Sequence, residues 1–294
     1  MSASVKSLLN HLTSPGPHRV RAGNLAVAGQ PGVVFTPERG TDLPAVAFGH
    51  GWLSGAGSYV RLLRHLASWG FVAAAPDSER GPVPSHLNLA GDLLTTLDIC
   101  TGVRLGDGQV TVHPERVALA GHGMGAGAAV IAAAQRPVGA VAALYPAPTA
   151  PAAEPLAEGI DTPALIVAGE SDIASVNGNA IPLARAWAGP VVLRTVDNAS
   201  HNGMVAGRRI LATLGAGKHE PRTERITRAL LVGYLTYQLL GDKAYEAFAD
   251  PEAKLPHTST VDPAPAEAEI EAIEDESRRL SGRQVVELVQ LLRK

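Results

Sequence analysis

The most informative stretch of the sequence is "VALAGHGMGAGAAV", residues 117–130. An apolar run typical of a buried strand enters a glycine turn, and an alanine-rich helical pattern follows. Two kinds of protein use such a strand, glycine turn and helix. One cradles a phosphate group on the turn, and the other presents the residue at the apex of the turn above a parallel sheet. The remaining sequence has to discriminate between these alternatives.

The phosphate alternative is a nucleotide-binding module built on residues 121–126. Gly121, Gly123 and Ala126 match the pattern G-x-G-x-x-G/A. A dinucleotide-binding fold also needs an acidic residue at the end of the next strand, where it holds the ribose. The next apolar run, "VGAVAALYP", ends in Tyr145 and Pro146 without an acid. Several strand patterns also precede the turn, so this alternative is the weaker one.

Apolar strand patterns alternate with helical patterns over residues 21–250, which predicts an α/β fold with a mostly parallel sheet and helices on both faces. "NLAVAG" and "GVVFTP" predict an antiparallel pair at the N-terminal edge. We expect three parts: an N-terminal helix and linker (1–20), the α/β domain (21–250), and a proline-rich acidic linker with a C-terminal helical tail (251–294). Helices are expected at 5–12, 57–69, 87–103, 124–135, 181–187 and 226–240.

Composition restricts the functional class. The net charge is −3, which gives no basic field for nucleic acid. Cys100 is the single cysteine, so no intrachain disulfide can form, and a reducing compartment fits. No stretch resembles a signal peptide or a membrane span. We therefore expect a cytoplasmic protein without a nucleic-acid partner or a membrane span.

The alternative to phosphate binding is a nucleophile elbow, G-x-S-x-G, in which Gly121 and Gly125 flank the apex residue Gly123. The catalytic partners should follow in the order acid, then histidine. Asp172 follows the apolar run "LIVAG", and His201 follows "VVLRTV". Because both follow strand patterns, both are expected at the carboxyl edge of the sheet, where open α/β proteins bind ligands.

These segments resemble the α/β-hydrolase superfamily, and more narrowly its dienelactone hydrolase, cutinase and polyester-hydrolase group, over about residues 24–245. The resemblance is carried by "GHGWLSG" (49–55), "AAPDSERGP" (74–82), "GHGMGAG" (121–127), "AGESDIASV" (168–176) and "DNASHNGM" (197–204). It implies the α/β-hydrolase fold, with Asp172 as the triad acid and His201 as the general base. It also implies that the backbone amides of Trp52 and Met124 form the oxyanion hole, and that Gly123 stands at the position of the nucleophilic serine.

Further residues beside this site are candidates for contact with the substrate, namely Gly51, Trp52, His122 and Tyr145. For His122 the alternative, which we favour, is a packing role beside the elbow. Residues 146–160 should lie over the site, where they could act as a small lid. His50, His122, Asp172 and His201 could converge, but they lack the ligand spacing of known metal motifs, so we expect no metal and no cofactor. Other nucleophiles are poor substitutes: Cys100 falls inside a predicted helix, Ser54 and Ser58 have no evident base, and Ser78 is expected to cap a turn.

Three functions remain open. The first is a serine-less pseudoenzyme that binds a small ester or acyl ligand, or a partner. The second is an active carboxylic ester hydrolase that carries an engineered Ser→Gly change. The third is the nucleotide-binding module. Apolar residues of the last predicted helix, such as Leu288 and Leu292, make residues 265–294 a candidate for docking on the domain, homo-oligomerisation or partner binding.

Overall fold

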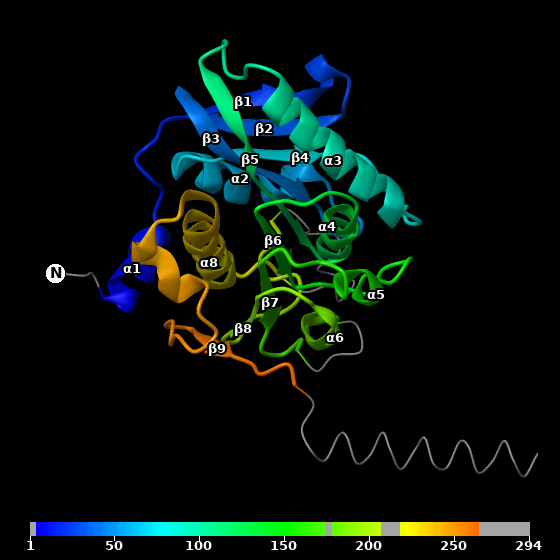
Figure 1. Ribbon diagram of the computed structural model, residues 1–294, viewed down its shortest axis with the longest axis vertical. Helices are drawn as coiled ribbons and strands as arrows, with labels where there is room; N and C mark the ends of the chain where they lie inside the picture. The colour runs from blue at the N-terminus through cyan, green and yellow to red at the C-terminus, as the bar shows by residue number, and fades with distance from the viewer. Residues whose placement is uncertain (1–3, 174–177, 207–217, 265–294) are drawn as a thin grey trace, which may run out of the picture. The chain divides into compact units, whose positions relative to one another are not determined.

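The computed structural model describes residues 4–173, 178–206 and 218–264 (Figure 1). Within these residues, the strands form one nine-stranded sheet in the order β1-β2-β4-β3-β5-β6-β7-β8-β9. The strands from β4 to β8 in this order pair in parallel, whereas β1, β2 and β9 pair antiparallel at the two edges. Their bounds are β1 Val20–Asn24, β2 Gly32–Pro37, β3 Gly40–Gly49, β4 Val72–Pro76, β5 Val110–His122, β6 Ala140–Leu144, β7 Ala164–Gly169, β8 Val191–Val196 and β9 Thr258–Thr260.

Helices cover both faces of the sheet, as predicted, and each face has its own buried apolar cluster. On one face lie α1 (Val5–Leu12), α2 (Val60–Ser68) and α8 (Pro221–Leu240) (Figure 1). On the other lie α3 (His86–Gly102), α4 (Met124–Gln135), α5 (Glu154–Ala157) and α6 (Ala180–Ala186). The central strands are buried on both sides, which explains their continuous apolar sequences.

The N-terminal edge differs from the prediction. An antiparallel pair is present, but the partner of β2 is Val20–Asn24 rather than residues 24–29. Leu25–Ala28 instead forms a 3-10 turn, η1. The Asn24 side chain accepts a hydrogen bond from the backbone N–H of Ala26 at 2.9 Å, and this cap competes with strand formation.

The C-terminal boundary also lies further along the chain than expected. Compact unit 1 spans Met1–Val261 and includes β9, although residues 251–261 were expected to be linker. The buried Arg194 of β8 holds the segment before β9, because its guanidinium donates to the carbonyls of Asp250 at 2.7 Å and Ala253 at 2.9 Å. A second unit begins at Asp262, and the predicted helical tail lies outside the described residues.

Two 3-10 segments complete the described elements, η2 (Ala56–Tyr59) before α2 and η3 (Lys243–Phe248) after α8. In the described part of the chain, no helix combines the length and the apolar character that a membrane crossing requires.

Candidate active site

The glycine turn between β5 and α4 has the backbone of an elbow. Gly123 lies at φ 56° and ψ −120°, directly before the first residue of α4, Met124. A residue with a Cβ atom pays about 1–3 kcal/mol for such a conformation, whereas glycine adopts it without a steric cost. The turn therefore lifts position 123 above the carboxyl edge of the sheet with little strain.

The flanking glycines of the elbow are explained by packing. A Cβ atom on Gly121 would lie 2.0 Å from the carbonyl oxygen of Gly125, and a Cβ atom on Gly125 would lie 2.3 Å from the carbonyl oxygen of Gly49. Real Cβ atoms do not approach backbone so closely, so β3, β5 and α4 can meet here only through glycine. This close packing accounts for the glycine pattern without a phosphate group.

Asp172 and His201 lie together opposite the elbow. Asp172 follows β7, His201 follows β8, and the Nδ1–H of His201 donates to Oδ2 of Asp172 at 2.8 Å. The Asp172 side chain is 10% exposed and the His201 side chain 25%. A Cβ atom at position 123 would lie 3.5 Å from Nε2 of His201, so the ring nitrogen that does not contact Asp172 faces the elbow.

A chain of hydrogen bonds joins the loop after β3 to the histidine loop. The backbone N–H of Gly51 donates to the Tyr59 hydroxyl at 3.0 Å, and that hydroxyl lies 2.9 Å from Nδ1 of His122. Nε2 of His122 lies 2.9 Å from the carbonyl oxygen of His201, which can only accept. These contacts assign the Nε2–H tautomer to His122, with Tyr59 donating to Nδ1.

Two of the candidates for contact with the substrate lie beneath the site instead. His122 is 1% exposed and supports the backbone of His201. Tyr145 is completely buried, and its hydroxyl lies 2.8 Å from the Thr227 hydroxyl. Burial raises the pKa of Tyr145, and the carboxylates of Glu220 and Asp172 raise it further. Their closeness in sequence to the elbow suggested ligand contact, but their side chains point into the core.

The loop after β3 brings Gly51 and Trp52 to the same edge as the elbow. Gly51 is in close contact with the site, since its Cα would lie 3.8 Å from a Cβ atom at position 123. Trp52 is 51% exposed, and its indole N–H donates to the carbonyl of Pro82 at 3.0 Å. Met124 opens α4, where backbone N–H groups have no partner within the helix. An oxyanion role for its amide stays a prediction.

Three of the other potential nucleophiles, Cys100, Ser78 and Ser54, are occupied or inaccessible. Burial raises the pKa of the Cys100 thiol to about 12, so it does not supply a thiolate. The Ser78 hydroxyl donates to Asp92, and the Ser54 hydroxyl is directed at the Trp52 carbonyl at 3.5 Å. Among the described residues, no group of three or more His, Cys, Asp or Glu side chains is arranged to hold a metal ion.

Sequence reasoning missed two residues that support the histidine loop, Tyr59 and Glu220. Tyr59 contacts His122 from 63 residues away, and Glu220 contacts Ser200 from 20 residues away. Neither residue belongs to a motif, and no periodic pattern links it to the site. Tertiary folding alone brings Tyr59 to His122 and Glu220 to the loop that carries His201.

The sheet order, the elbow after β5 and the acid and histidine after β7 and β8 define an α/β-hydrolase fold. A family model described as PET hydrolase-like matches residues 4–214, and the chain belongs to this family. The chain matched none of the curated proteins with which it was compared. The family assignment makes the molecule an esterase or hydrolase scaffold, and the fold prediction is confirmed.

Proposed function

We propose that this chain is a serine-carboxylesterase scaffold in which Gly123 occupies the nucleophile position, and that it binds an ester or acyl ligand with little or no turnover. The observation that carries the proposal is the Asp172–His201 pair, joined at 2.8 Å and facing position 123 across 3.5 Å. An acid and a base are in place, and the residue they face has no side chain.

The chemistry follows from what glycine lacks. In serine-type acyl transfer, a hydroxyl attacks the ester carbonyl while histidine takes its proton. With Gly123 there is neither the oxygen nor the proton, so no acyl-enzyme forms at this residue. Loss of the nucleophile alone costs about 10⁶ in kcat in a serine protease. His201 could still activate a water molecule, which would give a weak direct hydrolysis.

Exposed apolar side chains support an acyl ligand. Trp52 is 51% exposed, Val83 is 92% exposed and Leu87 is 52% exposed. The bond from Trp52 to the Pro82 carbonyl holds the indole next to the segment that carries Val83. Apolar surface at a catalytic edge favours a ligand with a hydrocarbon or aromatic acyl group.

The proposal is tested by hydrolysis of p-nitrophenyl acetate and p-nitrophenyl butyrate. The native chain, Gly123→Ser and Gly123→Ser/His201→Ala are compared side by side. We expect little turnover by the native chain, an increase of several orders of magnitude in Gly123→Ser, and loss of that increase when His201 is removed. Equal rates for all three proteins would show that the pair is not a catalytic base.

A second candidate is an active ester hydrolase in which the glycine replaces a serine by engineering. The intact Asp172–His201 pair favours it, because selection no longer maintains an acid and base once their nucleophile is lost. Both candidates predict the same behaviour of Gly123→Ser. They differ in the codon at position 123 of the source gene, so sequencing that gene separates them.

Binding of a partner, or of a second copy of this chain, through residues 265–294 is a separate proposal. The apolar residues at the end of the sequence motivate it. Light scattering on the full chain and on a chain ending at residue 264 tests it. The same number of protomers per particle in both would argue against self-association through this segment.

A further inference from the structure

We propose that Glu220, the residue directly before the first residue of α8, is a positioning residue for the general base His201. This inference rests on the proposed role of His201. Glu220 does not touch the reacting atoms. It acts through the backbone of the histidine loop, at the residues on either side of His201.

The contacts of Glu220 are concentrated on that loop. Its Oε1 accepts a hydrogen bond from the Ser200 hydroxyl at 2.6 Å, and its Oε2 accepts one from the Ser200 backbone N–H at 3.2 Å. Its own backbone N–H donates to the Gly203 carbonyl at 2.8 Å. Residues 200 and 203 are thus tied to one glutamate, and His201 lies between them.

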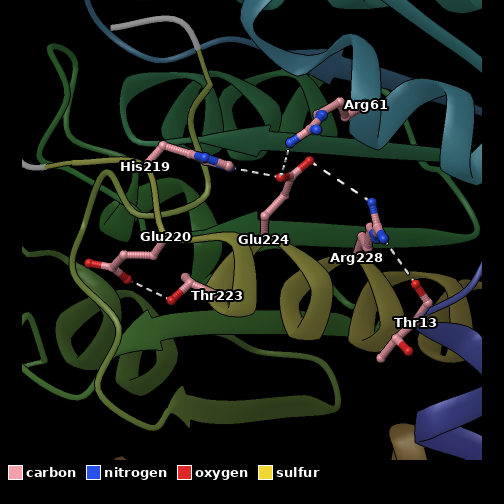
Figure 2. Close-up of polar contacts among 7 residues, drawn as sticks. All are labelled: Thr13, Arg61, His219, Glu220, Thr223, Glu224 and Arg228. Carbon is pink, nitrogen blue, oxygen red and sulfur yellow. Dashed lines mark hydrogen bonds and ion pairs between the residues drawn. The ribbon is translucent and has the colours of Figure 1, made fainter. Parts of the chain in front are cut away.

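The glutamate is itself fixed at the helix start. The Thr223 hydroxyl, three residues along, donates to Oε2 of Glu220 at 2.6 Å (Figure 2). Three donors therefore converge on one carboxylate, and such charge-assisted hydrogen bonds are stronger than neutral ones. Nε2–H of His122 also holds the His201 carbonyl at 2.9 Å. The histidine loop is thus held both at the His201 carbonyl and at Ser200 and Gly203, which restricts where the His201 ring can lie.

Gly203 gives independent evidence of how closely Glu220 approaches the loop. A Cβ atom on Gly203 would lie 2.3 Å from Oε2 of Glu220 and 2.7 Å from its Cδ. The glutamate therefore occupies the space of a side chain at position 203. An alanine there would displace the carboxylate while leaving every atom of Glu220 present in the protein.

The same helix turn provides a matched control, Glu224. It is a carboxylate four residues further along, buried where Glu220 is half-buried, and its partners are different: Arg61 at 3.2 Å and His219 at 2.7 Å. Figure 2 shows Glu220 turned away from this second cluster. Arg228, which donates to the Thr13 carbonyl at 2.9 Å, completes the contacts of Glu224 toward α1. Glu224 therefore stabilises helix packing without contacting the histidine loop.

The experiment uses the full chain carrying Gly123→Ser, with Glu220→Ala, Glu220→Gln or Glu224→Ala added. Misplacing a catalytic group by about 1 Å can cost 10²-fold, so we expect Glu220→Ala to lower kcat by about 10- to 100-fold, with KM within about threefold. Glu220→Gln should retain most of kcat, because both hydroxyls can turn to suit an amide. Glu224→Ala should lower the melting temperature but leave kcat within about threefold.

Gly203→Ala sharpens the test. It should lower kcat in the Gly123→Ser chain. It should have little further effect once Glu220→Ala is present, because the carboxylate that the new Cβ atom would meet is then absent. If Glu220→Ala lowers only the melting temperature, or if Gly203→Ala acts equally with and without Glu220, the positioning role is wrong.

A second readout does not depend on restored turnover. In the native chain, the ¹H resonance of His201 Nδ1–H, identified by its loss in His201→Ala, reports the bond to Asp172. We expect Glu220→Ala to broaden or remove it, and Glu224→Ala to leave it. A resonance unchanged by Glu220→Ala overturns the inference. Absence of turnover in Gly123→Ser alone, with this pattern intact, would overturn the proposed function and leave the positioning role standing.

Discussion

The two halves of the site are held in place in different ways. The elbow depends on backbone packed against backbone at Gly49, Gly121 and Gly125, where even a Cβ atom has no room. The histidine loop depends on polar side chains, chiefly His122 and Glu220. The fold accommodates glycine at position 123 because the backbone contacts that shape the elbow do not involve a side chain at its apex.

The largest effect is expected where the elbow packs most closely. Gly121→Ala should destabilise the protein by roughly 4 kcal/mol, because its Cβ meets a backbone carbonyl oxygen that has no side-chain freedom. Urea unfolding measures the change. Gly91→Ala is the control, since Gly91 is exposed on α3 and a new Cβ there would have no atom within 4 Å apart from its chain neighbours and its own helix backbone, and it should be neutral or slightly stabilising. Similar losses in both variants would remove the distinction between packed and unpacked glycines.

The free energy of unfolding should depend on pH through a buried histidine, His65. His65 of α2 is buried and donates to the Leu12 carbonyl at 2.8 Å. Burial, and then the nearby charge of Arg228, lower its pKa from 6.5 to about 4. Between about pH 6.5 and pH 4, His65 is therefore protonated in the unfolded chain but remains neutral in the folded chain.

The contribution of His65 is complete above its unfolded pKa and is lost as pH falls from about 6.5 to about 4, by up to about 3 kcal/mol. Urea unfolding at pH 7.5 and pH 4.5 measures this loss. His65→Gln retains a donor for Leu12 but does not titrate, so it should show a smaller loss. An identical pH dependence in His65→Gln would assign the effect to other groups.

The apex of the elbow should show a smaller effect on stability. Gly123→Ser places a Cβ atom at φ 56°, which should cost about 1–3 kcal/mol and lower the melting temperature. Calorimetry on the native and Gly123→Ser chains measures it. A higher melting temperature for Gly123→Ser would contradict the assignment of strain to this position.

Strongly patterned segments made most of the fold predictable. The α4 helix begins and ends where its sequence pattern indicates, and the buried strands are continuous apolar runs. β9 escaped prediction because Thr258–Thr260 is too short for a period and follows a proline-rich stretch. Leu25–Ala28 was misassigned because a continuous run of apolar residues fits a strand, while the local cap by Asn24 turned the chain.

The candidate site was predictable only for reactive residues that lie in a loop after a predicted strand. Asp172 and His201 come directly after β7 and β8, so their convergence could be inferred from the order of elements. For His122 the sequence left both substrate contact and packing open, with packing favoured. The packing role of Tyr145 could not be inferred, since a residue beside the elbow can point toward the ligand or into the core. No sequence pattern pointed to Glu220. It precedes α8, and only tertiary structure brings it next to the loop that carries His201.

Whether an acid–base pair faces an apex without a nucleophile can be read from the intact mass of the protein after incubation with p-nitrophenyl butyrate. For the Gly123→Ser variant we predict one butyryl group, carried by the serine introduced at position 123 and dependent on His201. For the native chain we predict none. A native chain that gains a butyryl group and turns it over would contradict the account, because another residue would then be the nucleophile.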